Sequence, residues 1–166
     1  DPPQVLVEGG SLKYLGVRIT MKSCGYSMDQ HELVENLIQT YEAVTNEKIR
    51  ARKSLPVPVE ELPPPMSDDP IDGTHCKDPV GLPESYLAYK MLEIDGLSPQ
   101  KRAHSLVGSG LYVARGTRMD ILVFIQLCSE GIHVWDSRYE RLLKEVLGYL
   151  KYHKRSLLYE YPNKPG

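Results

Sequence analysis

The clustering of proline is the feature that most limits how this 166-residue chain can fold. Eight of its 13 prolines lie between Pro56 and Pro83, together with several aspartates and few large apolar groups. Proline removes a backbone donor and interrupts helices and central strands. A segment so poor in apolar side chains also buries too little surface to offset its ordering entropy. The sequence therefore predicts a mobile or extended linker over 54–83, with structured segments on both sides.

Apolar residues at helical spacing indicate helices on both sides of this linker. The pattern Ser27-x-x-Gln30 is typical of a capping box and predicts a helix over about 28–44. After the linker, Pro99 follows a serine, which is the arrangement that opens a helix with a cap and a first-turn proline. This second helix is expected to run to about Ala114.

Two further helices are expected near the carboxyl end. Thr117-x-x-Asp120 predicts a cap, and the residues after it are apolar nearly all round. We therefore expect a central buried helix over 118–129, ended by Gly131. A last amphipathic helix is predicted over about 136–152.

Strand-like patterns occur at both ends of the chain. Residues 5–8 and 12–20 are predicted as strands, 23–26 as a turn and 157–161 as a terminal strand. In the second strand the alternation predicts one mostly apolar, buried face. That face comprises Lys13, Leu15, Val17, Ile19 and Met21.

Two glycines, Gly108 and Gly110, interrupt the second helix in its middle. Each costs roughly 1 kcal/mol relative to alanine, so a close approach of the backbone to another surface is expected. That surface is either a packed helix or a bound ligand. His104, Gly108 and Tyr112 are spaced four residues apart and therefore share one face.

The charge balance excludes a protein that binds nucleic acid through its overall charge. The formal net charge is −2, so any phosphate-binding surface must be a local patch. Lys144 and Lys151 share a helix face and could contact phosphates, or could form an ordinary solvated face. A second basic run comprises Lys48, Arg50, Arg52 and Lys53.

Several other classes of function are disfavoured. No segment approaches the roughly 20 apolar residues that span a bilayer. The three cysteines, Cys24, Cys76 and Cys128, have no pairing pattern, which favours a reducing compartment. No catalytic triad, glycine-rich phosphate loop or metal-ligand spacing is present. We predict no catalytic residue and no metal or cofactor site in this chain.

Four blocks in order resemble the end of the palm and the thumb of copia-type LTR retrotransposon reverse transcriptases. The most informative is Leu106 to Ile121, which is similar to the pattern Leu-Val-Gly-Ser-Leu-Leu-Tyr-Leu-Ala followed by Thr-Arg-Pro-Asp-Ile. The others are Lys13–Ile19, a Tyr-Leu-Gly strand; Ser27–Tyr41, the helix after it; and Tyr139–Tyr152, a late helix ending in Tyr-Leu-Lys. The departures are Gly110 for leucine, Met119 for proline and Gly148 for arginine.

The resemblance implies a surface that holds a template–primer duplex of RNA and DNA. In such enzymes the thumb helix lies along the minor groove, which would assign nucleic-acid contacts to His104, Gly108 and Tyr112. The strand with Lys13 and Gly16 resembles the primer grip, although a plain edge strand fits the residues equally well. Lys144 and Lys151 complete the predicted nucleic-acid-binding set.

The same resemblance implies that this chain alone is not a polymerase. The carboxylates that hold the magnesium ions of the parent enzyme belong to a Tyr-x-Asp-Asp turn, which is absent here. The expected partners are therefore the rest of the Pol polyprotein, with its palm and RNase H, and the expected location is cytoplasmic or nuclear.

The expected fold is α+β and mainly helical, with a short β-hairpin, a proline-rich linker and a thumb-like helical bundle. The expected divisions are a palm end over 1–26, a first helix and basic run over 27–53, an irregular insertion over 54–97 and the bundle with a terminal strand over 98–161. Two alternatives stay open: a domesticated or decayed non-enzymatic module that binds nucleic acid or protein, and an inert fragment.

Overall fold

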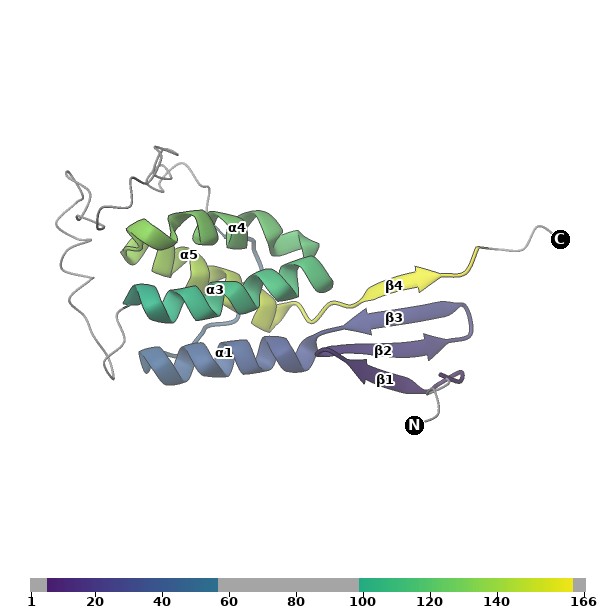
Figure 1. Cartoon of the computed structure of the whole chain (residues 1–166). Coiled ribbons are helices and arrows are strands. Elements are labelled where there is room, and N and C mark those ends of the chain that lie inside the picture. Colours follow the sequence, from purple (N-terminus) through teal and green to yellow (C-terminus); the bar gives the residue numbers. More distant parts are fainter. Residues whose placement is uncertain (1–5, 57–98, 163–166) are drawn as a thin grey trace, which may run out of the picture.

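A computed structural model describes residues 6–56 and 99–162. They form a four-stranded antiparallel sheet in the order β1-β2-β3-β4 and four α-helices that pack against one another beyond one end of that sheet (Figure 1). The class is therefore α+β and mainly helical. The predicted linker lies almost entirely outside the described residues.

The sheet begins with a tight hairpin where one continuous strand was predicted. Strands β1 (Ser11–Tyr14) and β2 (Val17–Lys22) are joined by Leu15 and Gly16, both with positive φ, at 48° and 80°. Two-residue hairpin turns of type I′ require this conformation at both positions. The prediction of one strand over 12–20 was wrong because leucine is an unusual residue at the first position of such a turn, and its presence gave no turn signal.

Two neighbouring predictions also fail. The segment before β1 forms a turn, closed by a hydrogen bond from Gly10 N–H to the Val7 carbonyl oxygen at 2.8 Å. After β2, residues 23 and 24 form a turn, as predicted. Strand β3 (Gly25–Asp29), which pairs with β2, then stands where the helix was expected to start. The capping-box prediction at Ser27 was therefore wrong, because strand pairing with residues 18–22 outweighs the local capping pattern.

The last strand, β4 (Leu157–Glu160), is where the sequence places it but pairs with β3 at the other end of the chain. Its Tyr159 ring stacks on Tyr26 with centroids 4.9 Å apart. The terminal strand thus joins the amino-terminal hairpin in one sheet rather than closing the helical bundle by itself.

The register places the apolar side chains of the sheet on one face, with the exception of Leu158, because residues opposite one another point the same way. We call this the apolar sheet face. None of its members is fully buried, and no helix packs across it in the part of the chain that the structure describes. It comprises Leu12, Tyr14, Val17, Ile19, Met21, Tyr26, Met28, Leu157 and Tyr159.

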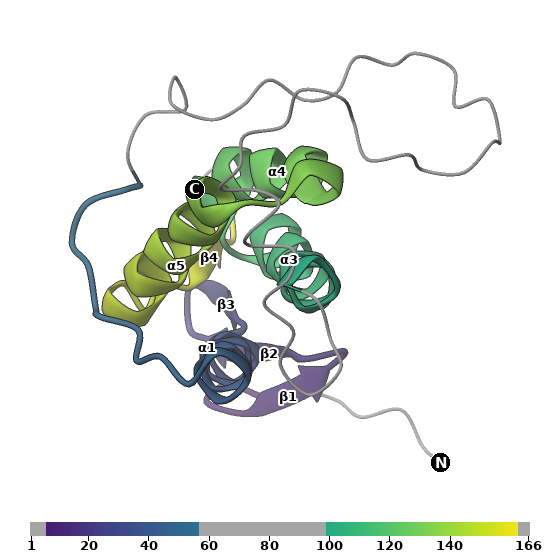
Figure 2. The ribbon, with the colours of Figure 1, turned by 90° about the vertical axis from the view of Figure 1, so that its left-hand side faces the viewer.

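Helix α1 (His31–Thr45) follows β3 directly and ends at Asn46, whose φ of 55° is the left-handed conformation common after helices. Its buried residues are Val34, Leu37, Ile38 and Tyr41. The apolar period predicts all four, while Leu33 and Val44, which it also includes, are half-buried. The segment 46–56, here called the strap, then runs past α5 (Figure 2). Ile49 of the strap is buried, and the Arg52 N–H donates to the Gly148 carbonyl oxygen at 3.0 Å.

The helices after the insertion are α3 (Pro99–Gly116), α4 (Leu122–Glu130) and α5 (Ser137–Tyr152). Short 3₁₀ turns lie between them, η2 (Met119–Ile121) and η3 (Gly131–Val134). Asp136 caps α5 by accepting from the backbone N–H groups of residues 138 and 139. The α5 bounds and the end of α4 at Gly131 confirm the sequence prediction.

The central helix is α5 and not α4. Eight α5 residues are buried, whereas α4 leaves Val123 63% exposed and Phe124 half-buried. The prediction failed because α4 is short and packs along one side only, so an apolar sequence all round does not bury it all round. Thr117 also does not cap it, since the Thr117 hydroxyl donates to the side chain of Gln30 at 2.9 Å.

Candidate nucleic-acid interface

One exposed stripe runs the length of α3 and contains the residues that the sequence singles out. His104, Gly108 and Tyr112 are all exposed on it. Helix α3 contains no aspartate or glutamate, while it carries Lys101, Arg102 and Arg115. The stripe therefore combines basic groups with a point where the backbone is uncovered.

The two glycines of α3 have different environments. A Cβ built on Gly108 would meet nothing within 4 Å in the described structure, whereas one on Gly110 would lie 2.9 Å from the buried Ile125 side chain of α4. Gly110 is thus the glycine that allows helix packing. Gly108 leaves the backbone open, so packing between the described helices does not explain it.

The hairpin tip meets the same stripe. The Tyr112 hydroxyl donates a hydrogen bond to the Leu15 carbonyl oxygen, 97 residues away in the sequence. Gly16, the next residue of the turn, has the positive φ that glycine adopts at no steric cost. The fold therefore brings Tyr112 and the Gly16 turn together, two predicted contact points from different blocks.

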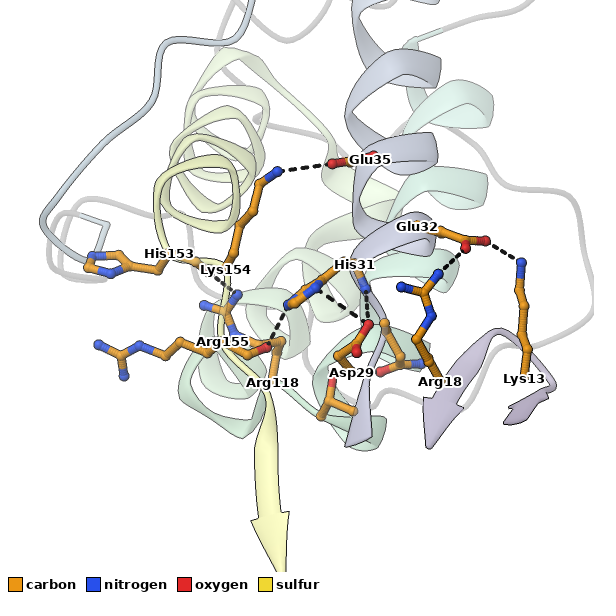
Figure 3. A network of polar contacts seen from close by, with 12 residues as sticks. Lys13, Arg18, Asp29, His31, Glu32, Glu35, Arg118, His153, Lys154 and Arg155 are labelled. Carbon is orange, nitrogen blue, oxygen red and sulfur yellow. Dashed lines mark hydrogen bonds and ion pairs between the residues drawn. The ribbon is translucent and has the colours of Figure 1, made fainter. Parts of the chain in front are cut away.

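Lys13 lies on the polar face of the sheet and forms an ion pair with Glu32 of α1, which Arg18 also contacts (Figure 3). The hydrogen bond and charge of Lys13, with a smaller effect of Arg18, lower the pKa of the Glu32 carboxyl. The positive charge of Lys13 is therefore balanced by a carboxylate in the free protein.

Lys144 and Lys151 form a second, separate group on α5. Lys144 pairs with Glu47 of the strap, and Lys151 donates to Glu42 of α1 at 3.1 Å and to the Ile49 carbonyl oxygen at 3.0 Å. These lysines hold α5 to α1 and the strap. The fold does not bring them onto the α3 stripe.

Glu42 is the centre of that second group. Its carboxylate accepts from Lys48 at 2.9 Å, from the Ile49 backbone N–H at 2.9 Å and from Lys151. These three hydrogen bonds lower its pKa from 4.5 to about 2. Residue Glu42 therefore fixes the start of the strap against both helices.

We expect the stabilisation from Glu42 to depend on pH in acid. A carboxyl with a lowered folded-state pKa stabilises the fold above its unfolded pKa of about 4.5, and this contribution is lost as the pH falls through about 2. The difference in urea midpoint between the wild type and Glu42→Gln should be constant near neutral pH and shrink steadily in that interval. A difference independent of pH would contradict the three hydrogen bonds.

Among the described residues, no group of three histidine, cysteine or acidic side chains is placed to hold a metal ion. Cys24 and Cys128 are free thiols, and burial raises the pKa of Cys128 to about 12, so this thiol is unreactive. Cys76 lies outside the described ranges. No described helix is both long and apolar enough to cross a bilayer.

Comparison with protein-family models, with curated proteins and with solved structures finds no match to this chain. The candidate interface therefore rests on the geometry of α3 and the hairpin tip and on the four sequence blocks. The sequence predicted only part of the apolar sheet face, namely Val17, Ile19 and Met21. The turn at Leu15 and Gly16 puts Lys13 on the other face, and the members from β3 and β4 join through strand pairing.

Proposed function

We propose that this chain is the palm end and thumb of a copia-type reverse transcriptase and that the α3 stripe holds a template–primer duplex. The observation that carries the proposal is the uncovered backbone at Gly108 on an exposed helix face without acidic residues. Such a face lets a sugar–phosphate edge come close. The chain contributes positioning and no chemistry, since the magnesium-binding carboxylates belong to the rest of the parent polymerase.

Charge supports this assignment. Phosphate contacts in nucleic-acid complexes come mainly from lysine, arginine and polar groups, and they are independent of sequence. Helix α3 offers Lys101, His104 and Arg115 on or beside the stripe. Lys13, Lys144 and Lys151 are paired with glutamates, so a duplex would have to displace those partners to use them.

The apolar sheet face supports the proposal that this chain is part of a larger protein. Nine apolar side chains that no described helix covers fit a surface buried by further protein. In the proposed parent this cover is the rest of the palm within the Pol polyprotein, and the protein acts inside the cell. The same face also favours the second candidate function, a non-enzymatic module that binds another protein.

Duplex binding by Gly108→Leu tests the proposal. The substitution adds a side chain at the point of closest approach, and we expect the affinity for an RNA–DNA primer–template to fall roughly tenfold. The fold should be unaffected or slightly stabilised, because leucine is the better helix former. Fluorescence anisotropy at fixed salt measures the affinity, and thermal unfolding measures the fold.

Ala43→Leu is the matched control, because Ala43 is an exposed residue of α1 away from the stripe. Its duplex affinity should equal that of the wild type. Equal duplex affinities of the two variants would contradict the duplex-binding function, and so would a lack of salt-dependent binding by the wild type. Either result would favour the protein-binding module.

A further inference from the structure

A groove of about 270 Å³ lies between α1, α5 and the turn that follows α3. One end is formed by Gln30 and His31 at the start of α1, by Thr117 and Arg118, and by Lys154 and Arg155 after α5. In Figure 3 the His31 ring meets the Arg155 backbone and Lys154 extends toward Glu35. The exposed Arg155 side chain extends away from His31, so it must turn toward the groove to reach a ligand. Neither the duplex proposal nor the apolar sheet face involves these residues.

Gln30 gives this end of the groove a buried hydrogen-bond donor that is held in place. Gln30 is 2% exposed, and its side-chain amide nitrogen has no hydrogen-bond partner among residues 6–56 and 99–162. The amide oxygen is fixed by the Thr117 hydroxyl at 2.9 Å. A Cβ on Gly116 would overlap the same amide, so the glycine makes room for it. A buried N–H group without a partner destabilises the protein, and a ligand acceptor would remove this cost.

The charges favour an anion as that acceptor. Four cationic side chains and two carboxylates, Glu35 and Glu42, line the groove. Arg118 is already paired with Asp120, and Lys151 with Glu42. Lys154 pairs with Glu35 at 3.0 Å, but Arg155 forms no ion pair with any described residue.

The other part of the groove is apolar. Val34, Ile38 and Leu150 are buried core residues that also line it. The groove therefore offers an anion site at one end and an apolar wall beside it. Its volume is just below the range of about 300–1,000 Å³ that holds drug-sized ligands.

We propose that this groove binds a small phosphate monoester with an apolar body. The phosphate accepts hydrogen bonds from the Gln30 amide and the Arg155 guanidinium, and the organic part lies against Val34, Ile38 and Leu150. The site is independent of the duplex proposal, because it lies on other elements and needs a free small molecule.

The test is a titration of the whole chain with phenyl phosphate, followed by the side-chain amide resonances of Gln30 in nuclear magnetic resonance. Saturable shifts of those resonances are expected. Inorganic phosphate should bind several-fold more weakly, because it lacks the apolar body. Equal binding of the two would overturn the apolar part, and a preference for a cationic probe such as benzylammonium would overturn the anion site.

Two variants locate the site. Gln30→Glu replaces the donor by a carboxylate that keeps an acceptor for Thr117, and it should weaken phenyl phosphate binding roughly tenfold or more. Arg155→Ser removes an exposed side chain without disturbing the core and should weaken binding several-fold. Unchanged binding in a folded Arg155→Ser protein would contradict the proposal, even if Gln30→Glu does not fold.

Arg115→Ser is the matched control, with the same change of charge on the α3 stripe. It should leave phenyl phosphate binding unchanged while weakening duplex binding, whereas Arg155→Ser should do the reverse. This crossed design separates failure of the groove from failure of the duplex interface. Equal loss of phenyl phosphate binding in both variants would show attraction by net charge only and overturn the groove site.

Discussion

Replacing Trp135 by alanine is expected to destabilise the protein by about 3–5 kcal/mol. Trp135, the only tryptophan, is 2% exposed and stacks on Tyr139 with ring centroids 5.6 Å apart. Its indole N–H donates to Glu140 at 3.0 Å. The ring sits between η3 and the Asp136 cap of α5, so its loss leaves a cavity where the last two helices join.

Urea unfolding followed by circular dichroism measures this effect without needing tryptophan fluorescence. Val123→Ala is the control, because that side chain is 63% exposed and should change stability by less than about 1 kcal/mol. Trp135→Phe should lie between the two, since it keeps most of the volume and loses the hydrogen bond. An equal effect of Trp135→Ala and Val123→Ala would show that the helix junction is not packed as described.

Gly148→Leu is expected to cost about 3 kcal/mol or more. A Cβ at Gly148 would lie 2.5 Å from the Arg50 carbonyl oxygen, which is backbone and cannot rotate away. The strap would have to leave α5. That would expose Ile49 and break the ion pair between Arg52 and Glu145, whose atoms are 2.6 Å apart.

Gly108→Leu is the matched control, since it makes the same change at a helical glycine with open space around it. The melting temperature should fall by roughly 6–12 °C for Gly148→Leu and stay level or rise slightly for Gly108→Leu. Similar falls for both variants would mean that both glycines serve packing.

The strap gives a physical reason why position 148 departs from the reverse-transcriptase pattern that the sequence resembles. Arginine is usual at the position of Gly148, but here the strap backbone crosses α5 at that point and the Gly148 carbonyl accepts from Arg52. A side chain and the strap cannot occupy the same place. Gly110, where leucine is usual, has a similar reason in its contact with Ile125. These two departures follow from packing and say nothing against the α3 stripe.

Part of the candidate site was evident from spacing alone. His104, Gly108 and Tyr112 share a face on any helix, and the structure places that face in solvent. Which glycine packs and which stays open was not evident, because it depends on Ile125 from the neighbouring helix. The pairing of Lys13, Lys144 and Lys151 with glutamates was equally hidden, since the partners lie 19 to 109 residues away.

The sequence by itself determined the helices that carry the core. The buried stripe of α1, the Asp136 start of α5 and the stop at Gly131 follow from apolar period and capping, which are properties of neighbouring residues. The tertiary structure alone decided the sheet, the strap and the groove. Strand β3 exists because it pairs with both β2 and the distant β4. The groove exists because Gln30 meets Gly116 and Thr117 across the fold, and no local pattern encodes contacts between such distant segments.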